Sequence, residues 1–456
     1  MIYDLIVIGG GPAGYIGAER AAQAGLNTLL VEKRHLGGVC LNEGCIPSKT
    51  FLHSAKIFDY ARYSQKYGVT AQNVELDHSA VIRRKNKVVK VLVSGIRTQL
   101  RNSNVNVVEG HAIISGKSSD GYTIKVNDET FTGRRLLIAT GSAPVIPPIP
   151  GVKEGLASGF VLTNREILDI PQVPGSLAVV GGGIVGLEMA SYFSSAGAKV
   201  TVIEMLDHIA GNIDADISRI LLNNFRKKGV EFKLNSREVE IKNGTVKYES
   251  AGKLEEINAD KVLMSVGRRP VVQDIGLESI CVEIEKGGIK TDEMGKTNIP
   301  EVYAAGDVNG RSMLAHTAYR EAEACVNNML GKRDIIRYNA IPSVVYTNPE
   351  VASVGETEET AREKGIEFDV VKLSMRYSGR YVAENEAGDG ICKLLINKEN
   401  RNVIGVHMIG SYSSEIIYGA GIMIETEMRI RDIKELVFPH PTVSEIIRES
   451  VFQFED

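Results

Sequence analysis

The sequence predicts an α/β protein in which two parallel, doubly wound sheets precede a C-terminal α+β domain. Three observations lead to this fold class: the length, a strand–turn–helix–strand pattern that occurs twice, and a change to β-rich runs from about residue 339. A chain of 456 residues is too long for one ordinary hydrophobic core. We therefore expect roughly two to four domains.

The repeated pattern consists of a strand, a glycine-rich turn, a helix and a second strand that ends in a glutamate. Its glycines and glutamates are Gly9, Gly11, Gly14 and Glu32 in residues 3–32, and Gly181, Gly183, Gly186 and Glu204 in residues 177–204. The glutamate follows the first glycine by 23 positions in both copies, from 9 to 32 and from 181 to 204. A lone turn of this kind is a weak signal, but the whole pattern found twice at one spacing is specific.

This pattern suits a dinucleotide for physical reasons. The first glycine permits a tight turn, the second lets the backbone approach a pyrophosphate, and the third allows the helix to pack closely on the strand. The N-terminus of the helix presents free N–H groups to the phosphates, and the glutamate accepts hydrogen bonds from ribose hydroxyls. The chain is therefore predicted to contain two Rossmann-like dinucleotide-binding domains.

The domain boundaries follow from the breaks between these patterns. A proline-rich crossover, Thr140 to Gly151, separates the two copies, and the segment Ser265 to Pro270 is interpreted as the return crossing. The predicted domains are the first dinucleotide-binding domain at 1–145, the second at 146–270, a central segment that completes the first at 271–338, and the C-terminal domain at 339–456.

Composition and charge exclude several classes of partner. The chain is 43% hydrophobic and 24% charged, with a net charge of -4, so nothing favours binding to nucleic acid or to an anionic membrane. The first strand-like run, Leu5 to Ile8, begins close to Met1, which leaves no room for a signal peptide. No apolar stretch is long enough to span a bilayer, and a cytoplasmic location is expected.

Two of the five cysteines carry a chemical signal. Cys281, Cys325 and Cys392 are isolated and are interpreted as ordinary packing or surface residues. Cys40 and Cys45 lie close together in a glycine-rich segment that follows the first dinucleotide pattern. A zinc site is the rival interpretation, but it would need four ligands and a shorter spacing, and no second pair supplies them.

A helix is predicted to begin near this cysteine pair. Pro47 suits the first position of a helix, and an apolar stripe follows it at Phe51, Leu52, Ala55 and Phe58. The positive end of the helix dipole favours a thiolate. Two neighbouring cysteines beside a flavin can pass two electrons by thiol–disulfide exchange.

The segment from Gly37 to Lys49 resembles the redox-active stretch of the pyridine nucleotide–disulfide oxidoreductases, in the version found in dihydrolipoamide dehydrogenases. The resemblance covers essentially the whole chain. Its further motifs are Ala139-Thr140-Gly141, Gly267-Arg268-Arg269-Pro270, Ala305-Gly306-Asp307, Met313-Leu314-Ala315-His316, Tyr346-Thr347-Asn348-Pro349-Glu350 and His440-Pro441-Thr442-x-Ser444-Glu445.

The resemblance implies a role for each matching residue. FAD would be bound by Gly9, Gly11, Gly14, Glu32, Lys49, Ala112, Thr140, Gly141, Ser142, Asp307, Leu314, Ala315 and His316. NAD would be bound by Gly181, Gly183, Gly186, Glu188, Glu204 and Gly267, and Glu188 also matches a glutamate that pairs with the equivalent of Lys49 beside the flavin. Cys45 would lie against the flavin, Cys40 would exchange with substrate, and His440, oriented by Glu445, would be the base.

The resemblance also implies a reaction and partners. Dihydrolipoyl thiolate would attack Cys40, and the electrons would pass through Cys45 and FAD to NAD. The protein would be a homodimer through its C-terminal domain, with His440 facing the dithiol of the other subunit, and it would serve lipoyl domains or the lipoyl carrier protein of a 2-oxo acid dehydrogenase or glycine cleavage complex. Two departures from the family pattern are Glu43, which places a carboxylate near the dithiol, and Phe438, which leaves His440 as the sole base candidate in its loop.

Two alternatives remain open. The chain could be another flavin disulfide reductase that acts on a different disulfide, although the acidic surroundings of Glu204 disfavour NADP and the C-terminus carries no cysteine pair. It could instead be a non-catalytic flavin-binding assembly subunit. Such a subunit would be expected to lack Cys40, Cys45 or His440, and all three are present.

Overall fold

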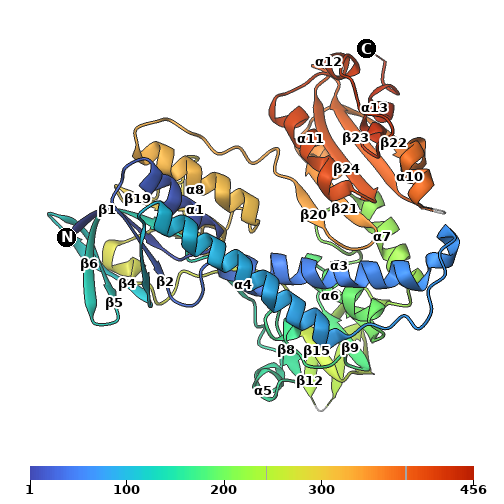
Figure 1. Cartoon of the computed structure of the whole chain (residues 1–456), viewed down its shortest axis with the longest axis horizontal. Coiled ribbons are helices and arrows are strands. Elements are labelled where there is room, and N and C mark those ends of the chain that lie inside the picture. Colours follow the sequence, from blue (N-terminus) through green and yellow to red (C-terminus); the bar gives the residue numbers. More distant parts are fainter. Residues whose placement is uncertain (243, 386–387, 456) are drawn as a thin grey trace. The chain divides into compact units, whose positions relative to one another are not determined.

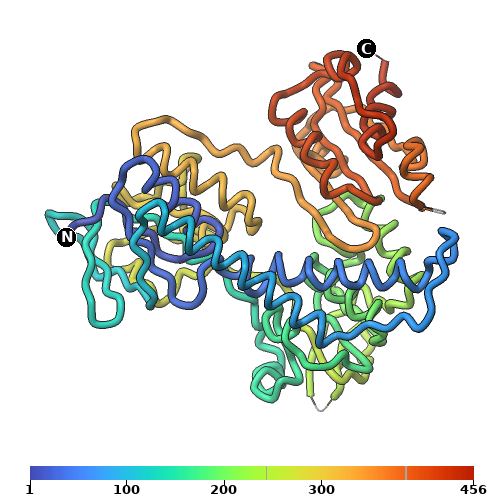
Figure 2. Tube along the Cα trace, in the orientation of Figure 1, coloured from blue at the N-terminus to red at the C-terminus, as the bar shows by residue number. Residues whose placement is uncertain are grey.

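Residues 1–242, 244–385 and 388–455 are described by a computed structural model, and the chain divides into two units (Figure 1). Unit 1 contains Met1–Thr50, Ala80–Val145 and Gly267–Arg337, and unit 2 contains Phe51–Ser79, Ile146–Val266 and Tyr338–Asp456. The chain trace in Figure 2 shows how unit 1 combines blue, cyan and orange segments that are far apart in the sequence.

Unit 1 is built on a mixed sheet ordered β3-β2-β1-β6-β5-β4, with β19 paired to β6. Its parallel strands are β1 (Ile2–Ile8), β2 (Thr28–Glu32), β3 (Asn106–Glu109), β6 (Glu129–Ile138) and β19 (Val302–Ala304). The strands β4 (Ala112–Ser118) and β5 (Gly121–Val126) pair antiparallel at one edge. Strands β1 and β2 are almost wholly buried, as expected for strands covered on both faces.

Two helices cover this sheet, α1 (Pro12–Gln23) and α8 (Ala315–Met329), and they pack against each other. Their core contains Leu5, Val7 and Leu137 from the sheet with Ala18 and Ala322 from the helices. Small residues allow the close approach. A Cβ on Gly17 would lie 2.5 Å from the Leu137 side chain. The long helix α4 (His78–Asn102) follows in the chain, and β7 (Ser142–Pro144) pairs with β16 (Arg268–Pro270) at the two crossings.

The first part of unit 2 repeats this plan. Its parallel sheet is ordered β11-β10-β9-β15-β8, made of β11 (Glu231–Lys233), β10 (Lys199–Ile203), β9 (Ser176–Val180), β15 (Lys261–Met264) and β8 (Val161–Leu162). The helices are α5 (Val152–Ser158), α6 (Ile184–Ser195) and α7 (Ala215–Lys227), and an antiparallel meander runs through β12 (Ser236–Lys242), β13 (Thr245–Ser250) and β14 (Lys253–Asn258).

The C-terminal part of unit 2 is an antiparallel sheet with helices. The sheet is ordered β20-β21-β24-β23-β22, made of β20 (Ser343–Val345), β21 (Glu350–Gly355), β24 (Val403–Gly410), β23 (Ile391–Asn397) and β22 (Phe368–Ser374). The helices α11 (Ser413–Glu425), α12 (Ile430–Lys434) and α13 (Glu445–Val451) share one hydrophobic core with it. The predicted fold class, two Rossmann-like domains followed by an α+β domain, is therefore confirmed.

The redox segment differs in detail from the prediction. Helix α2 (Gly38–Glu43) carries Cys40, and α3 (Cys45–Arg62) begins at Cys45 itself, so Pro47 is its third residue rather than its first. The apolar stripe is present, because Phe51, Leu52 and Ala55 are buried. In the described part of the chain no helix is both long and apolar enough to cross a membrane. The finer domain boundaries stay a prediction.

Candidate active site and dinucleotide turns

Each turn contains three glycines. The backbone and packing of the protein require the first and the third, but not the middle one. A Cβ on Gly14 would lie 1.8 Å from the Gly9 carbonyl oxygen, and Gly9 itself has a φ of +105°. In the second turn a Cβ on Gly186 would lie 2.3 Å from the Gly181 oxygen, and Gly181 has a φ of +100°. The first and third glycines are thus required by the backbone itself.

The middle glycines face open space. A Cβ on Gly11 would meet its nearest atom at 3.9 Å, and a Cβ on Gly183 would meet nothing within 4 Å. Both residues precede the first residue of a helix, α1 or α6, and no side chain caps either helix. The absence of a side chain here has no packing reason within the protein. It leaves room for a pyrophosphate at two helix N-termini, which is the fit expected of FAD and NAD.

The two glutamates hold the turns in the same way. Glu32 accepts hydrogen bonds from the N–H groups of Gly10 and Arg34, both at 2.6 Å. Glu204 accepts from Gly182 at 2.6 Å and Leu206 at 2.8 Å. A carboxylate has about four acceptor positions, so each can also accept ribose hydroxyls.

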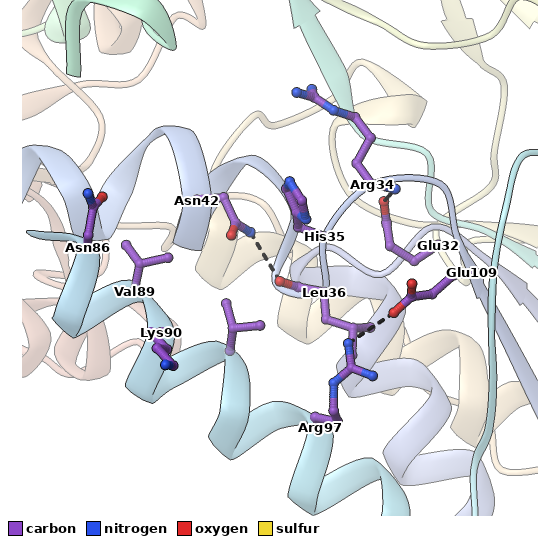
Figure 3. A pocket seen from close by; sticks show the side chains of 11 residues that line it. Glu32, Arg34, His35, Leu36, Asn42, Asn86, Val89, Lys90, Arg97 and Glu109 are labelled. Carbon is purple, nitrogen blue, oxygen red and sulfur yellow. Dashed lines mark hydrogen bonds and ion pairs between the residues drawn. The ribbon is translucent and has the colours of Figure 1, made fainter. Parts of the chain in front are cut away.

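A cavity of about 350 Å³ adjoins Glu32 in unit 1 (Figure 3). It is lined by Glu32, Arg34, His35, Leu36, Asn42, Asn86, Val89, Lys90, Val93, Arg97 and Glu109. Arg97 forms an ion pair with Glu109 at 3.0 Å, and Asn42 donates to the Leu36 carbonyl at 3.1 Å. The cavity lies next to the carboxylate that would hold the adenosine ribose, which suits the first cofactor.

The cysteine pair is the chemical centre of unit 1. Cys40 and Cys45 are free thiols that are hydrogen-bonded to each other, with Gly44 as the break between α2 and α3. Lys49 follows one turn along α3 and donates to Ser48 at 3.3 Å. The departure residue Glu43 forms an ion pair with Arg34 at 2.9 Å, so its carboxylate is balanced by a guanidinium.

The neighbours of Cys40 act on the pKa of its thiol in opposite directions. The hydrogen bond to Cys45 raises the pKa of Cys40, burial raises it further, and so does the charge of Cys45. Lys49 acts in the opposite direction. The thiol partner and burial together hold the pKa of Cys40 above its ordinary value in this dithiol form.

A polar cluster joins three distant segments of unit 1. Ser142 donates to the carboxylate of Asp307, and the Arg268 Nε donates to the Ser142 Oγ at 2.8 Å. Burial raises the pKa of Asp307, while Ser142 and Arg268 lower it. Thr140 donates to the Val271 carbonyl at 2.7 Å, and Gly141 has a φ of +69°. The cluster brings together the predicted residues at 140–142 and Asp307, and it fits a ligand rich in hydroxyls such as the ribityl chain.

Helix α8 supplies the third predicted element of the flavin site. Leu314 is its extended N-cap residue and makes no side-chain cap, and Ala315 and His316 form its first turn. The backbone N–H groups there suit an electron-rich ring edge. On the same helix Tyr319 shares a hydrogen bond of 2.7 Å with Tyr15, and burial raises the pKa of Tyr15.

The structure brings the predicted base and its carboxylate together in unit 2. The His440 Nδ1 lies 2.8 Å from the Glu445 Oε1, and the second carboxylate oxygen accepts from the Thr442 N–H at 2.9 Å. The Thr442 and His440 hydrogen bonds lower the pKa of Glu445. The His440 side chain is 77% exposed, so its second nitrogen is open to a partner or substrate.

The remaining predicted residues are Glu188, Ala112 and Gly267. Glu188 is buried in α6 and accepts from the Tyr346 N–H at 3.2 Å. Ala112 begins β4 and is buried. Lys49 belongs to unit 1 and Glu188 to unit 2, whereas Gly267, predicted for NAD, belongs to unit 1. Their roles stay predictions.

Sequence reasoning missed three contributors. Arg268 and the Tyr15–Tyr319 pair were not candidates, and the signal for Arg268 was only its place in a recognised motif. Within the described ranges, no group of three or more His, Cys, Asp and Glu side chains gathers as a metal site would require.

The chain belongs to the pyridine nucleotide–disulphide oxidoreductase family. Residues 3–322 match the family, and residues 341–451 match its dimerisation domain. Together with the dithiol and the two dinucleotide turns, this match defines the class of protein.

Individual relatives are similar over their whole length. The dihydrolipoyl dehydrogenase of Mycoplasma genitalium is 35% identical over 453 residues, which cover 98% of each chain. The mitochondrial dihydrolipoyl dehydrogenase of Pisum sativum is 37% identical over 463 residues, covering 99% of this chain and 91% of its own. Among solved structures, the HOCl-induced flavoprotein disulfide reductase RclA from Escherichia coli has a TM-score of 0.87 at 26% identity, covering 99% of this chain and 100% of its own.

Proposed function

We propose that this chain acts as an NAD-dependent dihydrolipoyl dehydrogenase, which oxidises protein-bound dihydrolipoamide to lipoamide. The observation that carries the proposal is the hydrogen-bonded thiol pair of Cys40 and Cys45 in the unit that holds the first dinucleotide turn. Full-length similarity to relatives named dihydrolipoyl dehydrogenase supports the substrate. FAD and NAD are the cofactors.

The chemistry of the thiols is a two-electron exchange. With Cys40 and Cys45 joined, a substrate thiolate attacks the Cys40 sulfur, the bond between the two cysteines breaks, and Cys45 leaves as a thiolate. The second substrate thiol displaces Cys40 and closes the substrate disulfide, which leaves Cys40 and Cys45 reduced. FAD, when bound, would supply the two-electron transfer between the dithiol and NAD⁺, the final acceptor.

His440 is the proposed base for the substrate thiols. A thiol must lose its proton before it attacks, and an imidazole held by a carboxylate is suited to accept that proton. The hydrogen bond to Glu445 at 2.8 Å orients the Nδ1, so the exposed Nε2 takes the proton. Glu445 in turn stabilises the resulting imidazolium.

We propose a homodimer that joins His440 of one subunit with the dithiol of the other. The match to a dimerisation domain at 341–451 supports the oligomer, and the exposure of His440 is compatible with it. The proposed partners are lipoyl domains, or a lipoyl carrier protein, of a 2-oxo acid dehydrogenase or glycine cleavage complex. The proposed location is the cytoplasm, and the proposed domains are 1–145, 146–270, 271–338 and 339–456.

One pair of assays tests the function. NAD-linked oxidation of free dihydrolipoamide is compared with NADPH-linked reduction of glutathione disulfide, using purified FAD-loaded protein. Activity in the first assay alone supports the proposal. Activity in the second alone would instead favour another flavin disulfide reductase, and no activity in either would favour a non-catalytic flavin-binding subunit.

A further inference from the structure

The long helix α4 (Figure 1) carries positive charge, whereas the chain as a whole is negative. Its part in unit 1, from Ala80 to Asn102, has seven lysines and arginines and no aspartate or glutamate, although the net charge of the chain is -4. Five of these cations are exposed and lie along one side of the helix, because they are three, four or seven positions apart: Arg83, Lys87, Lys90, Arg97 and Arg101. This basic stripe is about 27 Å long at the rise of an α-helix.

Much of the charge of the basic stripe is not balanced within the protein. Lys87, Lys90 and Arg101 form no ion pair in the described ranges. Arg97 pairs with Glu109 at 3.0 Å, but the two side chains are 62% and 68% exposed, so water screens the pair. Like charges four positions apart destabilise a helix. The stability of the fold therefore gives no reason to place Arg101 four positions after Arg97, and the arrangement indicates a charged partner.

The surroundings of the basic stripe favour a protein as that partner. Val91 is 62% exposed and lies next to Lys90 and one turn after Lys87, and an apolar contact bordered by polar groups is typical of protein interfaces. A membrane would need the apolar face of the helix, which α4 uses in the core of unit 1 through Ile96 and Leu100. The negative net charge of the chain disfavours nucleic acid.

The basic stripe adjoins the segment that carries the dithiol. Lys90 and Arg97 line the same cavity as Asn42 (Figure 3). Asn42 lies between Cys40 and Cys45 in the sequence, and all of these residues belong to unit 1. A protein bound along the stripe would therefore be held beside the thiol segment.

We propose that the basic stripe of α4 is the docking surface for an acidic face of the protein that carries the dihydrolipoyl group. The inference rests on the proposed function and adds to it the surface and the charge of the partner. Charge complementarity raises the rate at which two proteins associate more than it raises their final affinity. That suits a substrate protein, which must bind, exchange its thiols with the dithiol and leave in every turnover.

The test compares a small substrate with a protein-bound one, using purified, FAD-loaded protein. The substrates are free dihydrolipoamide and a reduced lipoyl domain of negative net charge. Lys87→Glu/Arg101→Glu should lower kcat/KM for the lipoyl domain about tenfold to hundredfold at low ionic strength, and high salt should remove most of the difference. The value for free dihydrolipoamide should not change, because this uncharged substrate needs no charged surface.

Two further variants control for charge and for stability. Lys332→Glu/Arg333→Glu makes the same change in net charge at two exposed positions of unit 1 outside α4, so it should keep the wild-type kcat/KM for both substrates. Lys87→Gln/Arg101→Gln removes the two charges without placing a carboxylate in the last turn of the helix, where the helix dipole disfavours it. This variant should show a smaller loss with the lipoyl domain alone.

The other outcomes overturn the inference. An equal loss in the Lys332→Glu/Arg333→Glu control would show that only net charge matters, and unchanged kinetics of the α4 variants would show that the partner docks elsewhere. If phosphatidylserine vesicles or duplex DNA bind the wild type but not the α4 variants, while the lipoyl-domain kinetics stay unchanged, the stripe serves a membrane or a nucleic acid. If the wild type oxidises neither substrate, the proposed function fails and the inference fails with it.

Discussion

The two glycine turns have nearly the same backbone geometry, whereas the segments that follow their second strands differ in structure. Gly9 and Gly181 have φ values of +105° and +100°, and each terminal glutamate accepts a turn N–H at 2.6 Å. After β2 the chain enters α2 and α3 with their two thiols. After β10 it enters a loop that reaches the buried N-cap Asp214 of α7.

This contrast shows where the two functions diverge. The turn and glutamate supply dinucleotide binding in both copies, because that chemistry needs only backbone N–H groups and one carboxylate. The segment after the second strand differs between the copies, because it carries the two thiols in the first copy and leads to the N-cap of α7 in the second. Substitutions in the first copy should therefore affect thiol chemistry and FAD binding, and substitutions in the second copy should affect NAD binding.

The largest effect should follow from removing a thiol of the first copy. Cys45→Ser should lower turnover on the order of 10³-fold or more, because no disulfide can form to accept electrons. NAD affinity, a property of the second copy, should not change. Dihydrolipoamide oxidation and NAD binding are measured on the same preparation.

A spectroscopic readout accompanies that loss. Two-electron reduction of the wild type should give a long-wavelength absorbance band from a thiolate against FAD, and Cys45→Ser should lack it while still binding FAD. Persistence of the band would contradict the thiol assignment. Cys281→Ser is the matched control, because Cys281 is an exposed, isolated cysteine.

The next largest effect concerns the base, which the C-terminal part of unit 2 supplies. His440→Gln should reduce turnover by about 10²–10⁴-fold, the usual contribution of a general base. Mixed dimers of Cys45→Ser and His440→Gln subunits should recover part of the activity, because one of their two sites draws both intact groups. Verified heterodimers that stay inactive would contradict a shared site.

Sequence patterns predicted what depends on short, fixed spacing. In each case the partners lie close together in the sequence: the first glycine turn with Glu32, the second with Glu204, Cys40 with Cys45, and His440 with Glu445. Contacts that depend on strand pairing were not predictable. Ser353 meets His407 through β-sheet register, and Arg268 meets Ser142 from 126 positions away.

The pKa of Cys40 depends on contacts that a linear motif does not contain. The hydrogen bond to Cys45 and burial both raise this pKa, whereas Lys49 lowers it.

A smaller effect should distinguish the two middle glycines. Gly11→Ala should weaken FAD binding and Gly183→Ala should weaken NAD binding, each by about 10- to 100-fold, because a methyl group occupies the space left for the pyrophosphate. Stability should change by at most about 1 kcal/mol, the scale of a cap residue. Flavin absorbance measures the FAD content of Gly11→Ala, and titration with NAD measures the NAD affinity of Gly183→Ala.

A packing glycine gives the contrasting control. Gly186→Ala would place its Cβ 2.3 Å from the Gly181 oxygen, so it should lower the unfolding temperature as well as the NAD affinity. If Gly183→Ala were equally unstable, the middle glycine would have a packing role after all.

Coenzyme preference should respond modestly to Glu204. Its carboxylate repels a 2′-phosphate, so Glu204→Gln should narrow the NAD preference over NADP about tenfold, while Glu32→Gln should leave the preference unchanged. The ratio of kcat/KM values for the two coenzymes measures the change. Equal use of both coenzymes by the wild type would show that Glu204 does not discriminate.

The smallest effect should come from the protonation of Asp216, a carboxylate of unit 2 that pairs with Lys372 and Lys393. Burial opposes ionisation of Asp216, but hydrogen bonds from Lys372, Arg219 and Lys393 lower its pKa to about 2. A depressed folded-state pKa stabilises the protein above the unfolded value and is lost as pH falls toward 2. Asp216 is partly exposed, so solvent screening limits the contribution to about 1 kcal/mol or less.

Asp216→Asn should therefore be slightly less stable than the wild type at pH 7, and the difference should shrink as the pH falls from about 4 toward 2. Denaturant unfolding at a series of pH values measures it. Asp128→Asn is the matched control, since that exposed carboxylate forms no ion pair within the described residues, and the variant should match the wild type at every pH. A constant gap between Asp216→Asn and the wild type down to pH 2 would mean that the carboxylate acts through packing rather than charge. The charge of Lys393 would then be balanced by Asp214 and Glu358.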